Sequence, residues 1–126
     1  MSADLEGLGR LAADEPGLEL LVLFGSRSRG DAHAGSDWDF GFVARAGFDA
    51  DPLLATLVEA LGTERVDLVD LARAGALLRF RAAREGRLLH EEQAAFERFR
   101  YEASSFWCEV EPVLRQAYAD VLEGLG

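Results

Sequence analysis

The stretch at residues 20–43, LLVLFGSRSRGDAHAGSDWDFGFV, limits most strongly what this chain can fold into. An apolar run ends abruptly at Gly25-Ser26, and a small, polar, glycine-punctuated segment follows. Asp37 and Asp39 then open a second apolar run. Because side chains alternate across a strand, both carboxylates are expected on one face, with the intervening aromatic side chains directed toward a core on the other. The stretch therefore predicts two strands joined by a polar loop, with two acids beside that loop.

The two carboxylates indicate a cation site. Carboxylates held this close repel each other, and a bound cation or a shared proton offsets the repulsion. Hard oxygen ligands on a strand suit Mg²⁺, which keeps several waters and takes one or two carboxylates plus substrate phosphates. Gly25 and Ser26 add backbone N–H groups and a short hydroxyl, which can hold phosphate oxygens. We therefore expect a site for a metal-bound phosphate group.

A third carboxylate lies downstream, in the segment RVDLVDL at residues 65–71. Asp67 falls in the middle of this expected strand, where an unpaired carboxylate is costly unless it meets a metal or a donor. Asp70 falls at the end of the strand, where a helix cap explains it.

These residues together resemble the signature of the polymerase-beta-type nucleotidyltransferases. More narrowly, they resemble the minimal nucleotidyltransferases that serve as antitoxins to HEPN-type toxins. The motif has glycine-serine, ten intervening residues and then Asp-x-Asp on a strand, followed by the downstream acid. In chain order, the residues that carry the resemblance are Gly25-Ser26, Arg29-Gly30, Ser36, Asp37-x-Asp39 and Asp67.

The resemblance implies an antitoxin-type protein adenylyltransferase. Such an enzyme transfers AMP from ATP, with Mg²⁺, to a tyrosine hydroxyl of a cognate HEPN-type RNase toxin in a hetero-oligomer, and so neutralises it. Asp37, Asp39 and Asp67 would be catalytic and would hold the metal, as two Mg²⁺ ions. The nucleotide would be bound by Gly25, Ser26, Arg29 and Ser36.

Two other functions remain open at this stage. The chain could neutralise a toxin by binding alone, because an acidic surface can cover the basic active site of an RNase. It could instead adenylylate a small molecule, although such enzymes add an acceptor-binding domain. The intact set of three carboxylates favours catalysis over masking.

Composition restricts the remaining choices. The chain has 126 residues, which fits one domain, and a net charge of −10, which does not attract a nucleic acid backbone. Every basic residue is an arginine, so the glycine-rich stretch cannot be a P-loop with its lysine. One cysteine, Cys108, fits a reducing compartment, and no apolar segment approaches membrane-spanning length. We expect a cytoplasmic protein that binds neither membranes nor nucleic acid.

Hydrophobic periodicity predicts the individual helices and strands, including a long C-terminal helix. The resemblance supplies the topology, and it implies an α/β fold, a small mixed β-sheet with helices packed mainly on one side. One domain would span residues 1–126, with 91–126 as a helical extension. The expected helices are residues 3–14, 51–61 with Asp51 as N-cap, 72–85 and a long one from 91, and the expected strands are 19–24, 37–43, 65–71 and 87–90.

Some further residues invite two interpretations. His33 is expected to be exposed, His90 structural and Cys108 a small buried or half-buried packing residue. Arginines cluster near the end of the 72–85 helix, where they form either a solvated face or, less simply, a phosphate-binding surface. The aromatic residues of the last helix fit a core, and their breadth also allows a partner-binding face.

Overall fold

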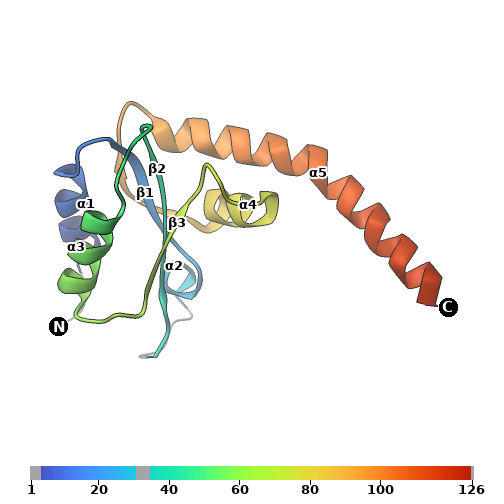
Figure 1. The fold of residues 1–126 in the computed structure, drawn as a ribbon, viewed down its shortest axis with the longest axis horizontal. Coiled ribbons are helices and arrows are strands. Elements are labelled where there is room, and N and C mark those ends of the chain that lie inside the picture. The colour runs from blue at the N-terminus through green and yellow to red at the C-terminus, as the bar shows by residue number, and fades with distance from the viewer. Residues whose placement is uncertain (1–3, 31–34, 126) are drawn as a thin grey trace.

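The computed structural model describes residues 4–30 and 35–125 (Figure 1). Expectations for Ala3, for His33 and for the rest of residues 31–34 lie outside that part of the chain. In chain order the elements are α1 (Leu5–Ala13), β1 (Leu18–Phe24), α2 (Ser26–Arg29), β2 (Trp38–Ala44), α3 (Asp51–Leu61), β3 (Val66–Asp70), α4 (Ala76–Glu85), β4 (Arg87–Glu91) and α5 (Ala95–Leu125).

The strands form one mixed sheet in the order β3-β2-β1-β4. β1 runs antiparallel to both of its neighbours, whereas β2 and β3 are parallel. β1 is buried along nearly its whole length, as its continuous apolar sequence predicts for a strand covered on both faces. The mixed sheet and the long C-terminal helix are both confirmed.

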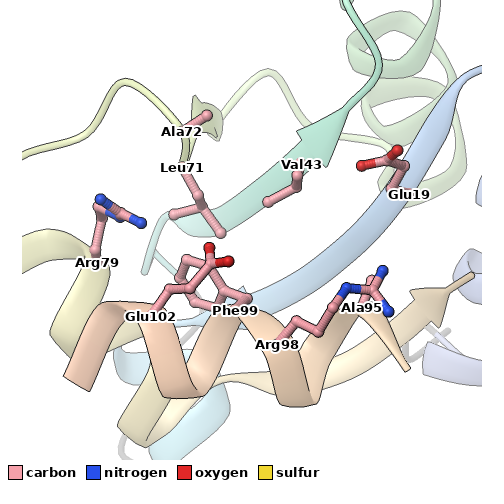
Figure 2. A pocket seen from close by; sticks show the side chains of 9 residues that line it. All are labelled: Glu19, Val43, Leu71, Ala72, Arg79, Ala95, Arg98, Phe99 and Glu102. Atoms are coloured by element: carbon pink, nitrogen blue, oxygen red, sulfur yellow. The ribbon is translucent and has the colours of Figure 1, made fainter. Parts of the chain in front are cut away.

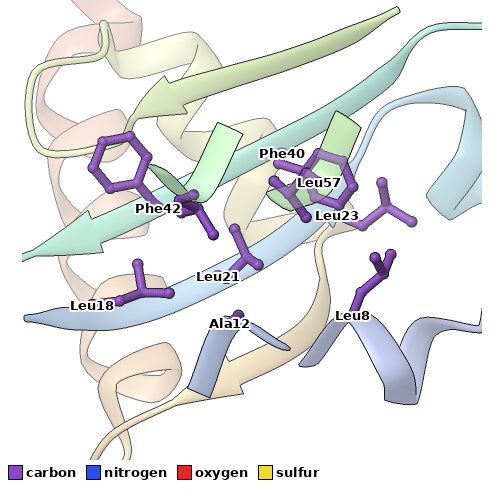
Figure 3. Close-up of a cluster of buried hydrophobic side chains, with 9 residues drawn as sticks. Leu8, Ala12, Leu18, Leu21, Leu23, Phe40, Phe42 and Leu57 are labelled. Carbon is purple, nitrogen blue, oxygen red and sulfur yellow. The ribbon is translucent and has the colours of Figure 1, made fainter. Parts of the chain in front are cut away.

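Helices cover both faces of the sheet, which corrects the expectation that they pack mainly on one side. The first face carries α1 and α3, whose Leu8 and Leu57 join Leu21 of β1 in one core cluster (Figure 3). On the second face, Ala82 of α4 and Phe99 of α5 pack around the opposite side of β1. β1 has apolar side chains at successive positions, so each face needs its own cover.

β2 places its aromatic residues as the alternating pattern predicts. Trp38, Phe40 and Phe42 all belong to the core beneath α1 and α3. Asp39 therefore projects to the other face, beside the start of β3. The strand itself begins at Trp38, so Asp37 lies just before it.

The starts of α3 and α4 differ from expectation, in both cases because an aspartate caps a turn. Asp51 is the first residue of α3 and not its N-cap, since the side chain of Asp49 accepts a hydrogen bond from the Asp51 N–H at 3.0 Å. The side chain of Asp70 accepts from the Ala72 N–H, also at 3.0 Å. Asp70 thus caps a turn, and α4 begins only at Ala76.

α5 begins four residues later than the expected start at residue 91. Glu91 still pairs with Leu20 as the last residue of β4. Gln93 and Ala94 then adopt positive φ angles of 48° and 60°, which breaks the chain direction before the helix.

α5 is a single helix of 31 residues, and Pro112 does not interrupt it. Its first turns pack on the body through Ala95, Phe99 and Ala103. The remainder extends well past the sheet and away from the other helices (Figure 1). In the described part of the chain, no helix combines the length and apolarity needed to cross a membrane.

Two glycines inside α1 provide a test of this packing. A Cβ on Gly9 would overlap the backbone carbonyl oxygen of Leu89 in β4, whereas a Cβ on Gly7 would meet only the side chain of Asp4, at 3.4 Å. Gly9→Ala should therefore lower the free energy of unfolding by about 1–3 kcal/mol. Gly7→Ala should raise it by about 0.5–1 kcal/mol, because alanine favours a helix interior. Urea unfolding measures both, and equal effects would contradict the contact between α1 and β4.

Candidate active site

Two carboxylates meet where the parallel strands β2 and β3 lie side by side. Asp39 and Asp67 are direct register partners, and their side chains are close enough to share a hydrogen bond when one of them is protonated. Asp39 is half-buried, whereas Asp67 is exposed. β3 is an edge strand of the sheet, so the Asp67 side of the pair is open to an incoming group.

The surroundings of Asp39 oppose its ionisation. Burial raises the pKa of the Asp39 carboxyl above its ordinary value, and the charges of Asp67 and Asp37 and the hydrogen bond with Asp67 raise it further. The guanidinium of Arg29 lowers this pKa, which places Arg29 within electrostatic reach. Three oxygen-donor groups thus act on one another with too little positive charge to balance them. A divalent cation, which prefers carboxylate oxygen, fits this donor set.

Asp37 acts on Asp39 through its charge, and its side chain does not form a metal-binding cluster with the other two acids. It is exposed and lies immediately before β2, where the next residue, Trp38, donates its N–H to the carbonyl of Arg65 at 2.9 Å. Within residues 4–30 and 35–125, no three acidic, histidine or cysteine side chains lie grouped closely enough to hold a metal ion. The structure therefore brings Asp39 and Asp67 into contact, with Asp37 at the margin.

Gly25 packs its backbone directly against the carboxylate pair. It follows β1, whose last residue, Phe24, is the register partner of Asp39. A Cβ on Gly25 would lie 2.6 Å from Oδ2 of Asp39, and the residue has a φ of +78°. Both the space and the backbone conformation therefore require glycine. Ser26 starts the short helix α2 at this point, so the glycine-serine turn lies beside the acids.

Two arginines of α2 stabilise the surroundings of the site. Arg29 donates to Glu85 of α4 at 3.1 Å, so this expected nucleotide-binding residue is held beside the acids by an ion pair. The guanidinium of Arg27 lies 4.1 Å from the ring centroid of Trp38 and donates to the Ser36 carbonyl oxygen at 2.8 Å. Arg27 thus connects α2 to the segment that enters β2.

Sequence reasoning missed Glu85 and Arg65 as neighbours of this site. Arg65 donates to the carbonyl of Gly35 at 2.6 Å, and thereby ties the entry of β3 to the entry of β2. Its partner is 30 residues away, and Glu85 is 56 residues from Arg29, so local spacing carries no signal for either contact. Arg29, which the resemblance assigns to the nucleotide, is the arginine whose charge lowers the pKa of Asp39.

A separate cavity of about 200 Å³ lies away from the acids, between the sheet and the helices α4 and α5 (Figure 2). Its lining includes Glu19, at the opposite end of β1 from Gly25, together with Arg79 and Phe99. None of Asp37, Asp39 and Asp67 lines it. The candidate site is thus separate from this cavity, and its Asp67 lies exposed on the edge strand β3.

A glycine turn against a carboxylate pair on adjacent strands, with an arginine in electrostatic reach, has the parts of a metal-dependent nucleotidyl-transfer site. The family model described as "Polymerase beta, Nucleotidyltransferase" matches residues 6–95. This chain belongs to the polymerase beta nucleotidyltransferase family.

Individual relatives narrow the comparison. The protein adenylyltransferase MntA of Aphanizomenon flos-aquae is 32% identical over 103 residues, which span 71% of this chain and 69% of the relative. A solved toxin–antitoxin structure with AMP-PNP is similar at a TM-score of 0.77 and 30% identity, over 93% of this chain and 96% of that one. A complex of tri-AMPylated Shewanella oneidensis HEPN toxin with MNT antitoxin is similar at a TM-score of 0.71 and 25% identity, over 94% and 99% of the two chains.

The raised pKa of Asp39 predicts how the metal-free protein responds to pH. A carboxyl whose pKa is raised by folding contributes stability below its unfolded pKa, and this contribution is lost as the pH rises through the folded value. Asp39→Asn should therefore raise the melting temperature at pH 7 by a few degrees. This gain should shrink as the pH falls through the raised pKa of folded Asp39 and should vanish below about pH 3.9, the ordinary pKa of an aspartate. Thermal unfolding across this pH range measures the effect. Asp14→Asn, an exposed change at the end of α1, is the control, and an equal gain in that variant would contradict the assignment.

Proposed function

We propose that this chain is an antitoxin-type protein adenylyltransferase, which transfers AMP from ATP to a tyrosine hydroxyl of a HEPN-type RNase toxin and so neutralises the toxin. The contact of Asp39 with Asp67, closed by the backbone of Gly25, is the observation that carries the proposal. Family membership and the similarity to MntA and to the AMPylated toxin complex support it.

Nucleotide binding follows from the turn after β1. Backbone N–H groups at Gly25 and Ser26, with the Ser26 hydroxyl, are donors for the triphosphate oxygens. Arg29 adds positive charge, and its ion pair with Glu85 holds it in place. Ser36 belongs to the same proposed site, since its carbonyl is fixed by Arg27 at the entry to β2.

The carboxylates define the metal part of the proposal. Asp37 and Asp39, completed by Asp67, would hold two Mg²⁺ ions, which supply positive charge to the triphosphate and lower the pKa of an attacking hydroxyl. This assignment is consistent with the mutual repulsion that raises the pKa of Asp39.

The transfer step then has a simple balance of atoms. The tyrosine oxygen bonds to the α-phosphorus of ATP while the bond from that phosphorus to its bridging oxygen breaks, and pyrophosphate leaves. The tyrosine proton passes to the Asp67 carboxylate, which lies exposed on the edge strand β3. Asp39, half-buried and fixed by the sheet, positions the nucleotide relative to that oxygen.

The position of Asp67 suits a protein acceptor. Asp67 lies exposed on the edge strand β3, where a side chain of a partner protein can approach the acids. The net charge of −10 suits a basic RNase and disfavours direct contact with its RNA. We place the reaction in the cytoplasm, with residues 1–126 as one minimal domain and 91–126 as its helical extension.

Replacement of the paired acids tests the catalytic assignment. Asp39→Asn and Asp67→Asn each keep the shape of the side chain and remove its charge, so each should reduce AMP transfer by at least about 10²-fold. The measurement is intact-mass analysis of the HEPN-type toxin encoded beside this chain, after incubation with ATP and Mg²⁺. AMP-sized additions should appear with the unmodified chain only.

Asp70→Asn is the matched control, because Asp70 lies on the same strand and its side-chain oxygen caps a turn, a role that asparagine can keep. This variant should transfer AMP at an unchanged rate. If both Asn variants at 39 and 67 kept full transfer, the site assignment would be wrong. A stable complex in which even the unmodified chain adds no mass would show instead that the chain neutralises its toxin by masking.

A further inference from the structure

The outer half of α5 carries an apolar surface that the other residues of the described structure leave uncovered. From residue 112 to residue 125 every residue is exposed, although the segment includes large apolar side chains. Val113 is 67% exposed, Tyr118 67% and Leu125 78%. A helix that packs against nothing is not stabilised by burial of its apolar side chains, so these residues need another explanation.

Helical periodicity shows that this surface continues one already buried in the body. Phe99, Ala103, Val110, Leu114 and Val121 follow one another at intervals of four and seven residues, which keeps them on one line along the helix. Phe99 and Ala103 are buried against the sheet and α4, Val110 is half-buried, and Leu114 and Val121 are 50% and 60% exposed. The same face of α5 is thus packed at one end and open at the other.

The open part begins where α4 stops covering α5. Phe80 of α4 stacks on Trp107 at a ring-centroid distance of 5.2 Å, and Arg79 lies over the ring of Phe106 at 5.3 Å. Beyond these contacts the helix continues alone, past the edge of the body (Figure 1). We define the α5 stripe as six apolar side chains on this face of the helix from this point onward, namely Val110, Val113, Leu114, Tyr118, Val121 and Leu125.

Charge beside the α5 stripe selects the kind of partner. Residues 108–125 contain four acids and one arginine, a net charge of −3, and Arg115 is already bonded to Glu111 at 2.6 Å. Glu109 and Asp120 share one edge of the stripe, three turns apart. Two copies of this chain would bring these acidic edges together, and the whole chain already carries −10. The complementary surface is therefore apolar at its centre and basic at its rim.

We propose that the α5 stripe is the docking surface for the HEPN-type RNase toxin, an inference that rests on the proposed function. An RNase binds a polyanion and so presents basic side chains, which complement the acids beside the stripe. The stripe faces the same side of α5 as the buried contacts with the body, so a partner seated on it lies against the body as well as the helix. This docking surface does not include the carboxylates. It determines the affinity for the toxin and leaves the rate of AMP transfer in the complex unchanged.

The test uses two charge insertions of equal size on opposite faces of α5. Leu114→Glu with Val121→Glu places two acids in the centre of the stripe. Cys108→Glu with Ala119→Glu places two acids on the far face of the same helix, at residues that are also exposed. All four positions are exposed, so circular dichroism should show the same helix content and melting temperature for both variants.

The probe is the toxin encoded beside this chain, titrated by calorimetry without ATP and then used as substrate with ATP and Mg²⁺. The stripe variant should raise Kd by at least about 100-fold, since apolar anchors at the centre of an interface dominate its affinity. Its KM for the toxin should rise in parallel, with kcat at saturating toxin unchanged. The far-face variant should match the unmodified chain in both measurements.

A stripe variant with Kd and KM within about threefold of the unmodified chain would overturn the proposal. The proposal would also be overturned if the unmodified chain did not bind the toxin. It would be overturned as well if the unmodified chain alone sedimented as a dimer and the stripe variant sedimented as a monomer. If the unmodified chain binds the toxin but transfers no AMP, the proposed function fails, and Kd alone still decides whether the stripe is the docking surface.

Discussion

The parallel pairing of β2 with β3 is the constraint on which the candidate site depends. This register sets Asp39 directly opposite Asp67, at a place where their charges oppose each other. A slip of one residue would turn every side chain of β3 to the other face and separate the two acids. Two cores resist such a slip, because β2 contributes Phe40 to the core beneath α1 and α3, while Leu71, just after β3, packs in the core beneath α4 and α5.

The repulsion between the acids of the site lowers the stability of the fold, and a bound ligand can remove this repulsion. Burial and neighbouring charge raise the pKa of Asp39, so ionisation of the acids lowers the stability of the fold. A cation that binds the folded state and neutralises these charges stabilises the fold through the same groups that it uses for binding. Gly25 keeps the site compact, because the space against Asp39 has no room for a side chain.

The sequence predicted the positions of the strands, and the closeness of the glycine-serine turn to Asp39, because these features depend on residues that lie near one another in the chain. Asp39 and Asp67 could be named as partners only through the family resemblance, since pairing between strands that are distant in sequence leaves no periodic signal. The predicted starts of α4 and α5 were wrong, because single residues at these places hold the chain in a turn or in the sheet. Asp70 caps a turn and delays α4, and Glu91 stays in the sheet and delays α5. The contact of Arg29 with Glu85 crosses 56 residues and follows only from the folded packing.

The length of α5 has a consequence for how such a protein can diversify. Its outer half shares no residue with the glycine turn or the acids, and it contributes nothing to the two cores beyond Ala103. Substitutions there escape the constraints that act on the sheet, so they can accumulate without loss of the fold. With the α5 stripe as the proposed docking surface, related proteins could acquire different partners and keep the same chemistry. Changes in only a few turns of one helix would then separate one pair of partners from another.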